Sequence, residues 1–109
     1  MNRTEIVTLT NMCMVYDNNG NVLVQNRNNP DWPGITFPGG HVEPGEPFYD
    51  SVIREIKEET GLTIKNPQLC GVKENRIRDV HFSTRSPPYF LGWRTKFTPK
   101  VTIFSTPYI

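Results

Sequence analysis

The chain has 109 residues, of which 36% are hydrophobic and 21% are charged, and its formal net charge is +1. This length and composition suit one small domain with a single core, so residues 1–109 are expected to form one domain. A charge this close to zero argues against a general nucleic-acid-binding or membrane-surface protein, and no segment is apolar enough for a signal peptide or a membrane span. A cytoplasmic protein is therefore expected.

The first third of the chain predicts short strands. Residues 8–16 and 22–25 are expected to be strands, joined by a turn in which Asn19-Gly20 supplies the positive φ angles of a tight hairpin. Cys13 lies in the first apolar run and Cys70 in a later one. Isolated cysteines in such runs are typical of buried free thiols rather than disulfides or metal ligands.

A polar loop and a second short strand follow. Residues 26–34, NRNNPDWPG, are broken by prolines and are expected to form the loop. Residues 35–37 predict a strand that ends at Pro38. Gly39 and Gly40 then begin a second loop, after which residues 41–43 extend briefly.

The clearest element is a helix over residues 47–60. Pro47 fits the first helical position, where its missing N–H costs nothing, and Gly61 suits the left-handed residue just past the end. Short strands are expected at residues 62–64 and 69–72. Mixed strands with one helix indicate an α/β or α+β arrangement. The tail after residue 74 is expected to be irregular or weakly stranded, without an amphipathic helix.

This helix places three glutamates at the border between its core face and solvent. The residues expected on the core face are Phe48, Tyr49, Val52, Ile53, Ile56 and Thr60. Glu55, Glu58 and Glu59 overlap one edge of that face, whereas Lys57 points away from it. Like charges at these spacings repel one another, and an ordinary charged helix face is the common explanation of such runs. Partial burial makes unpaired carboxylates unfavourable, however, so a shared divalent cation such as Mg²⁺ is the better explanation here.

The neighbouring residues support a metal and phosphate site. Gly39 and Gly40 allow the backbone to approach a ligand closely, and a carbonyl there would be a suitable hard ligand for the metal. Glu46 stands just before the helix, where it would either compensate the helix dipole or assist the site. Arg54 would form a surface ion pair or, as we favour, orient a carboxylate by a two-pronged hydrogen bond.

The stretch GHVEPGEPFYDSVIREIKEETGL, from Gly40 to Leu62, resembles the complete Nudix box. Every fixed position of that motif is filled, from Gly40 through Glu46 to Arg54-Glu55-Ile56, Glu58-Glu59 and Gly61-Leu62. The upstream segments TNMCMVYDNNGNVLVQNR and WPGITFPGGHVEPGE are similar to MutT-like 8-oxo-dGTP diphosphatases. The resemblance covers roughly residues 5–73.

The resemblance implies an α/β/α sandwich with a mixed sheet, and a hydrolase that uses Mg²⁺ or Mn²⁺. It implies cleavage of a nucleoside diphosphate linked to another group, such as removal of 8-oxo-dGTP in the service of DNA repair. Carried over, Glu55, Glu58, Glu59, Glu46 and the Gly40 carbonyl would hold metal. Glu55 would also activate the attacking water, and Arg54 would hold Glu55 in place.

Residues 74–109 do not resemble the family. Residues 1–74 carry six basic and ten acidic side chains, whereas residues 75–109 carry six basic side chains against Asp79 alone. The coincidence of this charge change with the end of the resemblance motivates the hypothesis of a truncated, frame-altered or divergent tail. An incomplete sandwich would expose sheet edge and apolar surface, which favours a homodimer.

Substrate selection is open to several interpretations. Trp32 would stack on a base or pack in its loop, and Asn11 would recognise a purine edge or bond within the fold. Alternatives to 8-oxo-dGTP are a nucleotide sugar, a dinucleotide, or a non-catalytic nucleotide-binding role. The last alternative is motivated by aromatic residues of the tail, which would contact a polyanion: Tyr89, Phe90, Trp93 and Phe97.

Overall fold

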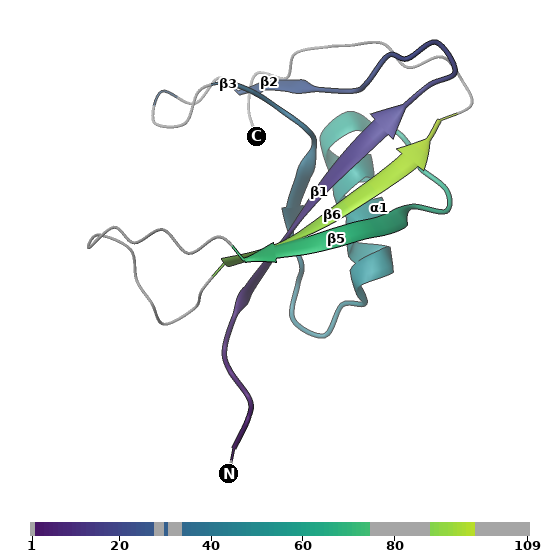
Figure 1. Ribbon diagram of the computed structural model, residues 1–109. Helices are drawn as coiled ribbons and strands as arrows, with labels where there is room; N and C mark the ends of the chain where they lie inside the picture. Colours follow the sequence, from purple (N-terminus) through teal and green to yellow (C-terminus); the bar gives the residue numbers. More distant parts are fainter. Residues whose placement is uncertain (1, 28–29, 31–33, 75–87, 98–109) are drawn as a thin grey trace.

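The computed structural model describes residues 2–27, 30, 34–74 and 88–97. The elements in chain order are β1 (Thr8–Tyr16), β2 (Gln25–Arg27), β3 (Gly34–Thr36), β4 (Gly39–His41), α1 (Phe48–Thr60), β5 (Gln68–Glu74) and β6 (Pro88–Lys96) (Figure 1). Four strands form one mixed sheet in the order β4-β1-β6-β5, in which only β1 and β6 are parallel. Strands β2 and β3 form a second, antiparallel sheet. The expected mixed α/β fold is confirmed.

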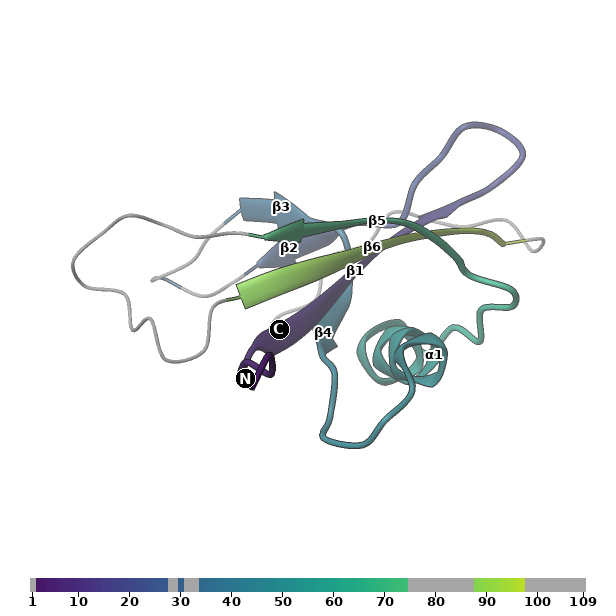
Figure 2. The ribbon, with the colours of Figure 1, turned by 60° about the horizontal axis from the view of Figure 1, so that its bottom comes forward.

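The hydrophobic core lies between the four-stranded sheet and α1, which packs along one side of the sheet (Figure 2). Strand β1 shows how the sequence builds it, because Asn11, Cys13 and Val15 alternate with more exposed neighbours and point to the same side. The buried hydrophobic residues are Cys13, Val15, Leu23, Val52, Ile56, Ile64, Leu91 and Trp93. The helix therefore meets the sheet through Val52 and Ile56.

The helix agrees with its sequence pattern at its C-terminal end. Gly61 adopts φ 77°, and its N–H donates to the carbonyl of Lys57, so the left-handed cap is confirmed. At the other end, Pro47 is the N-cap residue rather than the first helical residue. Phe48 and Tyr49 remain 44% and 42% exposed, so their expected burial in the core was wrong, although the ring of Tyr49 lies edge-on to that of the core residue Trp93.

Three short segments differ from the sequence-based expectation. The second strand begins at Gln25 rather than at Val22. Val22 instead forms an isolated bridge with Tyr16 at the end of β1. Gly39–His41 form β4, paired with residues 10–12 of β1, where a loop was expected at Gly39 and Gly40. Residues 62–64 are not a strand, although Ile64 is buried. Gly39 leaves room for the backbone of β1, because a Cβ atom there would overlap the carbonyl of Asn11.

The largest correction concerns the tail. Residues 88–96 form β6, a nine-residue strand between β1 and β5, where irregular or weakly stranded structure was expected. Leu91, Trp93 and Thr95 are buried on one side of β6, and Arg94 and Lys96 are exposed on the other. Trp93 thus belongs to the core, and Phe97 packs against it, so these two aromatic residues are not free to contact a polyanion.

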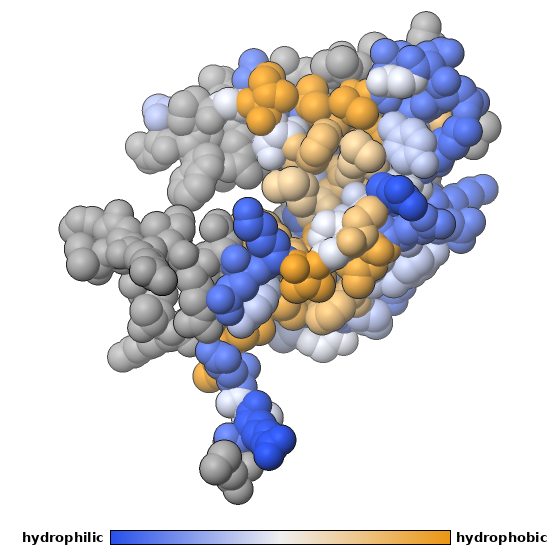
Figure 3. Space-filling view, in the orientation of Figure 1, coloured by the Kyte–Doolittle hydropathy of each residue, from blue (hydrophilic) through white to orange (hydrophobic). Residues whose placement is uncertain are grey.

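Strand β5 forms an edge of the four-stranded sheet, and all seven of its residues are exposed. Val72 and Met12, both exposed, help to line an open groove of about 590 Å³ on the sheet, with Phe90. Figure 3 shows hydrophobic residues gathered on this face of the molecule. The expected exposure of a sheet edge is confirmed, whereas the homodimer stays a prediction. The helix in the described ranges is too short and too polar to span a membrane.

The two cysteines have opposite environments. Both are free thiols, as expected, and Cys13 is fully buried, but Cys70 is exposed, so its predicted burial was wrong. A bulge in the pairing of β5 with β6 falls between Leu69 and Gly71, at Cys70. Burial, together with the charge of Cys70, raises the pKa of the Cys13 thiol to about 12.

We expect a maleimide at neutral pH to modify Cys70 in the native protein and to modify Cys13 only after unfolding. The reason is that a thiol must be both accessible and ionised to react. Peptide mass spectrometry before and after addition of urea measures the two rates. Equal native labelling of both cysteines would contradict the placement of Cys13 in the core.

Candidate active site

Two glycines bring strand β4 against both β1 and α1. A Cβ atom on Gly39 would overlap the backbone carbonyl of Asn11, and one on Gly40 would overlap the carboxylate of Glu55. The N–H of Gly39 donates to Oε2 of Glu59 at 3.2 Å. The glycine pair is therefore the point at which the backbone of the sheet meets two of the helix carboxylates.

Glu55 is a buried carboxylate, with 9% of the residue exposed. This burial raises its pKa above the ordinary glutamate value, and Arg54 only partly offsets the effect. Nη1 of Arg54 lies 3.0 Å from Oε1 of Glu55. A carboxylate held in this way still favours additional positive charge, which is the property expected of a cation ligand or a proton acceptor.

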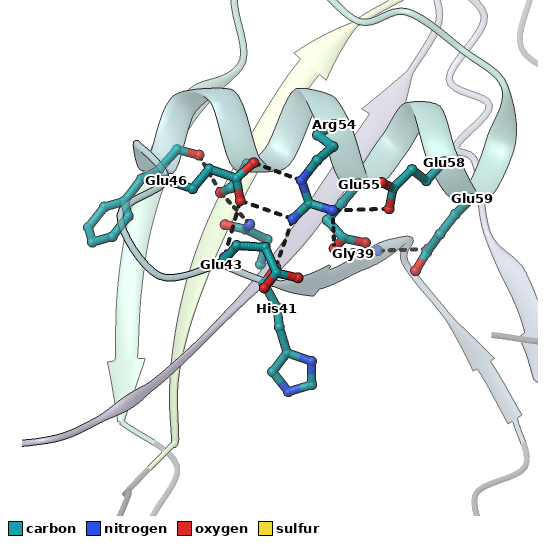
Figure 4. A network of polar contacts seen from close by, with 11 residues as sticks. Gly39, His41, Glu43, Glu46, Arg54, Glu55, Glu58 and Glu59 are labelled. Atoms are coloured by element: carbon teal, nitrogen blue, oxygen red, sulfur yellow. Dashed lines mark hydrogen bonds and ion pairs between the residues drawn. The ribbon is translucent and has the colours of Figure 1, made fainter.

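Arg54 forms ion pairs with Glu46, Glu55 and Glu58 (Figure 4). Its guanidinium donates from Nε and Nη2 to the two oxygens of Glu46, at 2.7 and 3.0 Å, and from Nη1 to Oε2 of Glu58 at 3.0 Å. Nη2 also donates to the carbonyl of His41 at 3.1 Å. These bonds hold the pKa of Glu46 below its usual range. The two-pronged bond of Arg54 is confirmed, with Glu46 as its carboxylate.

We expect Arg54→Lys to lower the urea midpoint of unfolding, because an ammonium cannot reproduce the planar fork that bonds Glu46, Glu58 and His41 together. Arg94→Lys is the matched control, since Arg94 is exposed and its Nε makes a 3.4 Å bond to Gln68. Urea denaturation followed by circular dichroism measures both variants. Equal shifts in the two variants would show that the guanidinium fork of Arg54 contributes nothing.

A cavity of about 380 Å³ lies beside the glycine pair. The helix contributes Glu55 and Glu59, β4 contributes Gly39 and Gly40, and β1 contributes Asn11. The remaining lining residues are Thr10, Met12, Gln25, Thr36, Phe37, His41, Glu43 and Phe90. Five residues singled out from the sequence thus meet in one cavity.

Other predicted site residues are placed elsewhere. Glu46 and Glu58 are bonded to Arg54 and do not line the cavity, and the Glu58 side chain is 58% exposed. Asn11 is 2% exposed, and its amide donates to Oγ of Ser51 at 2.8 Å and accepts from Nε1 of Trp93 at 2.9 Å. The amide of Asn11 thus serves the fold. Trp32 lies outside the described residues.

Sequence reasoning missed Gln25, Phe37 and Phe90 as cavity residues. Gln25 was detectable, because it follows Leu23 by two positions and therefore shares the inward side of an extended segment. Phe90 was not detectable, because the strand that carries it was not recognised.

The residues fit a divalent cation in their chemistry. Mg²⁺ in proteins is usually held by one or two carboxylates together with waters and substrate phosphates. Glu55 and Glu59 supply carboxylate oxygens to the cavity wall, and the backbone of Gly39 and Gly40 beside them supplies carbonyl oxygens. Within the described part of the chain, no three His, Cys, Asp or Glu side chains stand close enough together to hold one metal ion by themselves. The arrangement therefore suits a cation that the substrate helps to bind.

Comparison with known proteins agrees with this geometry. The family model described as the NUDIX domain matches residues 8–103. The ADP-ribose pyrophosphatase of Methanocaldococcus jannaschii is 42% identical over 66 residues, which are 61% of this chain and 39% of that protein. The 8-oxo-dGTP diphosphatase of Escherichia coli is 37% identical over 49 residues, which are 45% of this chain and 38% of that protein.

Solved structures share the fold. The MutT protein from Bacillus halodurans superposes with a TM-score of 0.70 and 31% identity, over 84% of this chain and 57% of that one. The MutT protein from Methanosarcina mazei superposes with the same TM-score at 19% identity, which shows the fold alone. The chain thus spans less than half the length of the two curated relatives described above.

Proposed function

This chain belongs to the NUDIX domain family, and on that premise we propose that it hydrolyses a nucleoside triphosphate to a monophosphate and pyrophosphate with the help of Mg²⁺ or Mn²⁺. The observation that carries the proposal is the position of Glu55 and Glu59 on the wall of a cavity that Gly39 and Gly40 also line. Proteins of this family generally use divalent metals and bind small nucleotides.

Each acidic residue has a proposed role. Glu55 and Glu59 hold the cation from the cavity wall, and the carbonyl of Gly40 adds an oxygen ligand. Glu58 would be a further ligand of the cation, and Glu46 holds the Arg54 guanidinium that also bonds Glu58. When bound, Mg²⁺ neutralises charge on the phosphate oxygens, which is the main requirement of phosphoryl displacement.

Glu55 is also the proposed proton acceptor. Water forms a new bond to phosphorus, the bridging P–O bond to the leaving pyrophosphate breaks, and the proton of the water passes to a carboxylate oxygen of Glu55. Its burial supports this role, because a carboxylate with a raised pKa accepts a proton more readily near neutral pH. Arg54, 3.0 Å from Oε1 of Glu55, fixes the orientation of that carboxylate.

We favour 8-oxo-dGTP or a related oxidised purine nucleotide as the substrate. Its hydrolysis would remove damaged precursors before DNA synthesis. The Escherichia coli relative is named for this reaction. A second candidate is ADP-ribose, since the Methanocaldococcus jannaschii relative carries the higher identity, 42%. Both reactions would use the same carboxylates, because each cleaves a diphosphate.

The experiment is a panel of 8-oxo-dGTP, dGTP, ATP and ADP-ribose, each incubated with the protein and either Mg²⁺ or a chelator. Ion-exchange chromatography identifies the products. We expect metal-dependent release of pyrophosphate and a monophosphate, with 8-oxo-dGTP the fastest. Faster cleavage of ADP-ribose would select the second candidate, and no metal-dependent cleavage of any compound would contradict the enzymatic function.

A further inference from the structure

Gln25 has an amide without a hydrogen-bond partner. The residue is 1% exposed, and neither Oε1 nor Nε2 bonds to any group in the described residues. The other buried amide of the cavity, Asn11, uses both of its ends in bonds to Ser51 and Trp93. Buried amides are nearly always bonded, so this one requires a partner, and a ligand in the cavity that Gln25 lines can supply it.

Gln25 lies at the wall of the candidate cavity. It begins β2, is paired in register with Thr36 of β3, and lines the cavity that Glu55 and Glu59 also line. Phe37 and Phe90 line the same cavity, and aromatic side chains are the usual surfaces on which bases stack. A nucleotide whose phosphates lie at the two carboxylates would extend its remaining part toward other walls of this cavity.

The chemistry of an amide selects the part of the nucleotide that it recognises. A phosphate offers only acceptors and would leave Oε1 of Gln25 unpaired. A nucleobase edge offers a donor and an acceptor side by side, which a glutamine amide matches with two hydrogen bonds.

We propose that Gln25 is a specificity-determining residue that recognises the six-position edge of a purine through its amide. Nε2 donates to an acceptor on the base and Oε1 accepts from a donor on the base. The proposal rests on the proposed function only in that the ligand is a nucleotide, and it does not require that the nucleotide be cleaved.

The test is calorimetric binding of three monophosphates to the wild-type protein and to Gln25→Met. The ligands are GMP, AMP and purine riboside 5′-monophosphate, which share the sugar and the phosphate, although the third lacks a six-position substituent. We expect the wild-type protein to bind GMP or AMP about 5- to 150-fold more tightly than the unsubstituted purine, the range of one two-bond amide–base contact. We expect Gln25→Met to bind all three with similar affinity.

A matched control separates this role from a general effect on the cavity. Thr36→Val changes the polarity of the neighbouring lining residue, whose hydroxyl already donates to the carbonyl of Phe37, and should keep the wild-type preference among the three ligands. The same preference in the wild-type protein and in Gln25→Met would overturn the proposal. Failure of the wild-type protein to bind any of the three would overturn it as well.

Stability gives a second, independent readout. Methionine has a similar shape without the amide, so Gln25→Met should be at least as stable as the wild-type protein in urea if the amide is unpaired. A marked loss of stability would show that the amide is bonded within the fold, and would overturn the proposal. None of these binding measurements requires hydrolysis. A failure of the protein to hydrolyse nucleotides would therefore refute the proposed function and leave the role of Gln25 unaffected.

Discussion

Replacing Glu55 with glutamine is expected to lower kcat for nucleotide hydrolysis by about 10²- to 10⁴-fold, the range associated with loss of a positioned acid–base group. The glutamine keeps the size of the side chain and the contact with Gly40, but it neither accepts the proton nor neutralises a cation. Glu55 is the most buried of the helix carboxylates, so solvent cannot easily replace it. Steady-state release of pyrophosphate measures the effect.

Asp50→Asn is the matched control for this variant, because it removes one negative charge from the exposed side of the same helix. The control should retain the activity of the wild-type protein. If the two variants lost the same fraction of activity, the effect would come from the net charge of α1 rather than from the position of Glu55.

Glu55→Gln is also expected to change how stability depends on pH in the absence of metal. Burial raises the pKa of Glu55 in the folded protein, so the folded state binds this proton more tightly than the unfolded chain does. The stability that this carboxyl contributes is present below the unfolded pKa, about 4.3, and is lost as the pH rises through the folded pKa. Glu55→Gln should therefore weaken this decline in urea denaturation curves measured in a chelating buffer.

Replacing Gly40 with alanine is expected to remove most of the activity while leaving the fold largely intact. The added Cβ would occupy the position of the Glu55 carboxylate, which is the flexible end of a side chain and can move aside. Moving aside takes Glu55 away from Arg54 and from the cavity wall. Activity and urea denaturation of the same preparation separate the two effects.

Gly39→Ala should have the opposite profile. Its Cβ would overlap the backbone carbonyl of Asn11, which cannot move without separating β4 from β1, so a loss of about 1–3 kcal/mol in unfolding free energy is expected. Gly71→Ala is the control for both variants, because Gly71 lies in a strand with no atom within 4 Å of an added Cβ. Similar behaviour of all three variants would contradict the close approach of β4 to α1.

Local patterns predicted the part of the site that lies within one continuous segment. The left-handed position of Gly61 and the burial of Glu55 and part of Glu59 follow from spacing along a single helix, whereas Glu58 is exposed. The fork of Arg54 joins this helix to Glu46, which lies just before it. Gly39 and Gly40 were recognised as points of close approach, although their pairing with β1 depends on a strand distant in sequence.

The features that were missed depend on contacts between distant segments. Residues 88–96 look irregular alone, and they form a strand because β1 and β5 flank them and bury Leu91 and Trp93. Cys70 is exposed because β5 is the edge of the sheet, which an apolar sequence run does not reveal. Phe48 and Tyr49 are apolar residues at helical spacing, yet 44% and 42% of their surfaces stay exposed at the start of the helix, although the ring of Tyr49 lies edge-on to Trp93.

The central proposal is that the carboxylates of α1 bind a divalent cation together with a diphosphate. The direct measurement is a titration of Mn²⁺ followed by electron paramagnetic resonance, with and without a non-hydrolysable nucleotide triphosphate. The wild-type protein should bind Mn²⁺ more tightly when the nucleotide is present, and the double variant Glu55→Gln, Glu59→Gln should lose this gain. Equal Mn²⁺ binding by the wild-type protein and the double variant, in the presence of nucleotide, would contradict the claim.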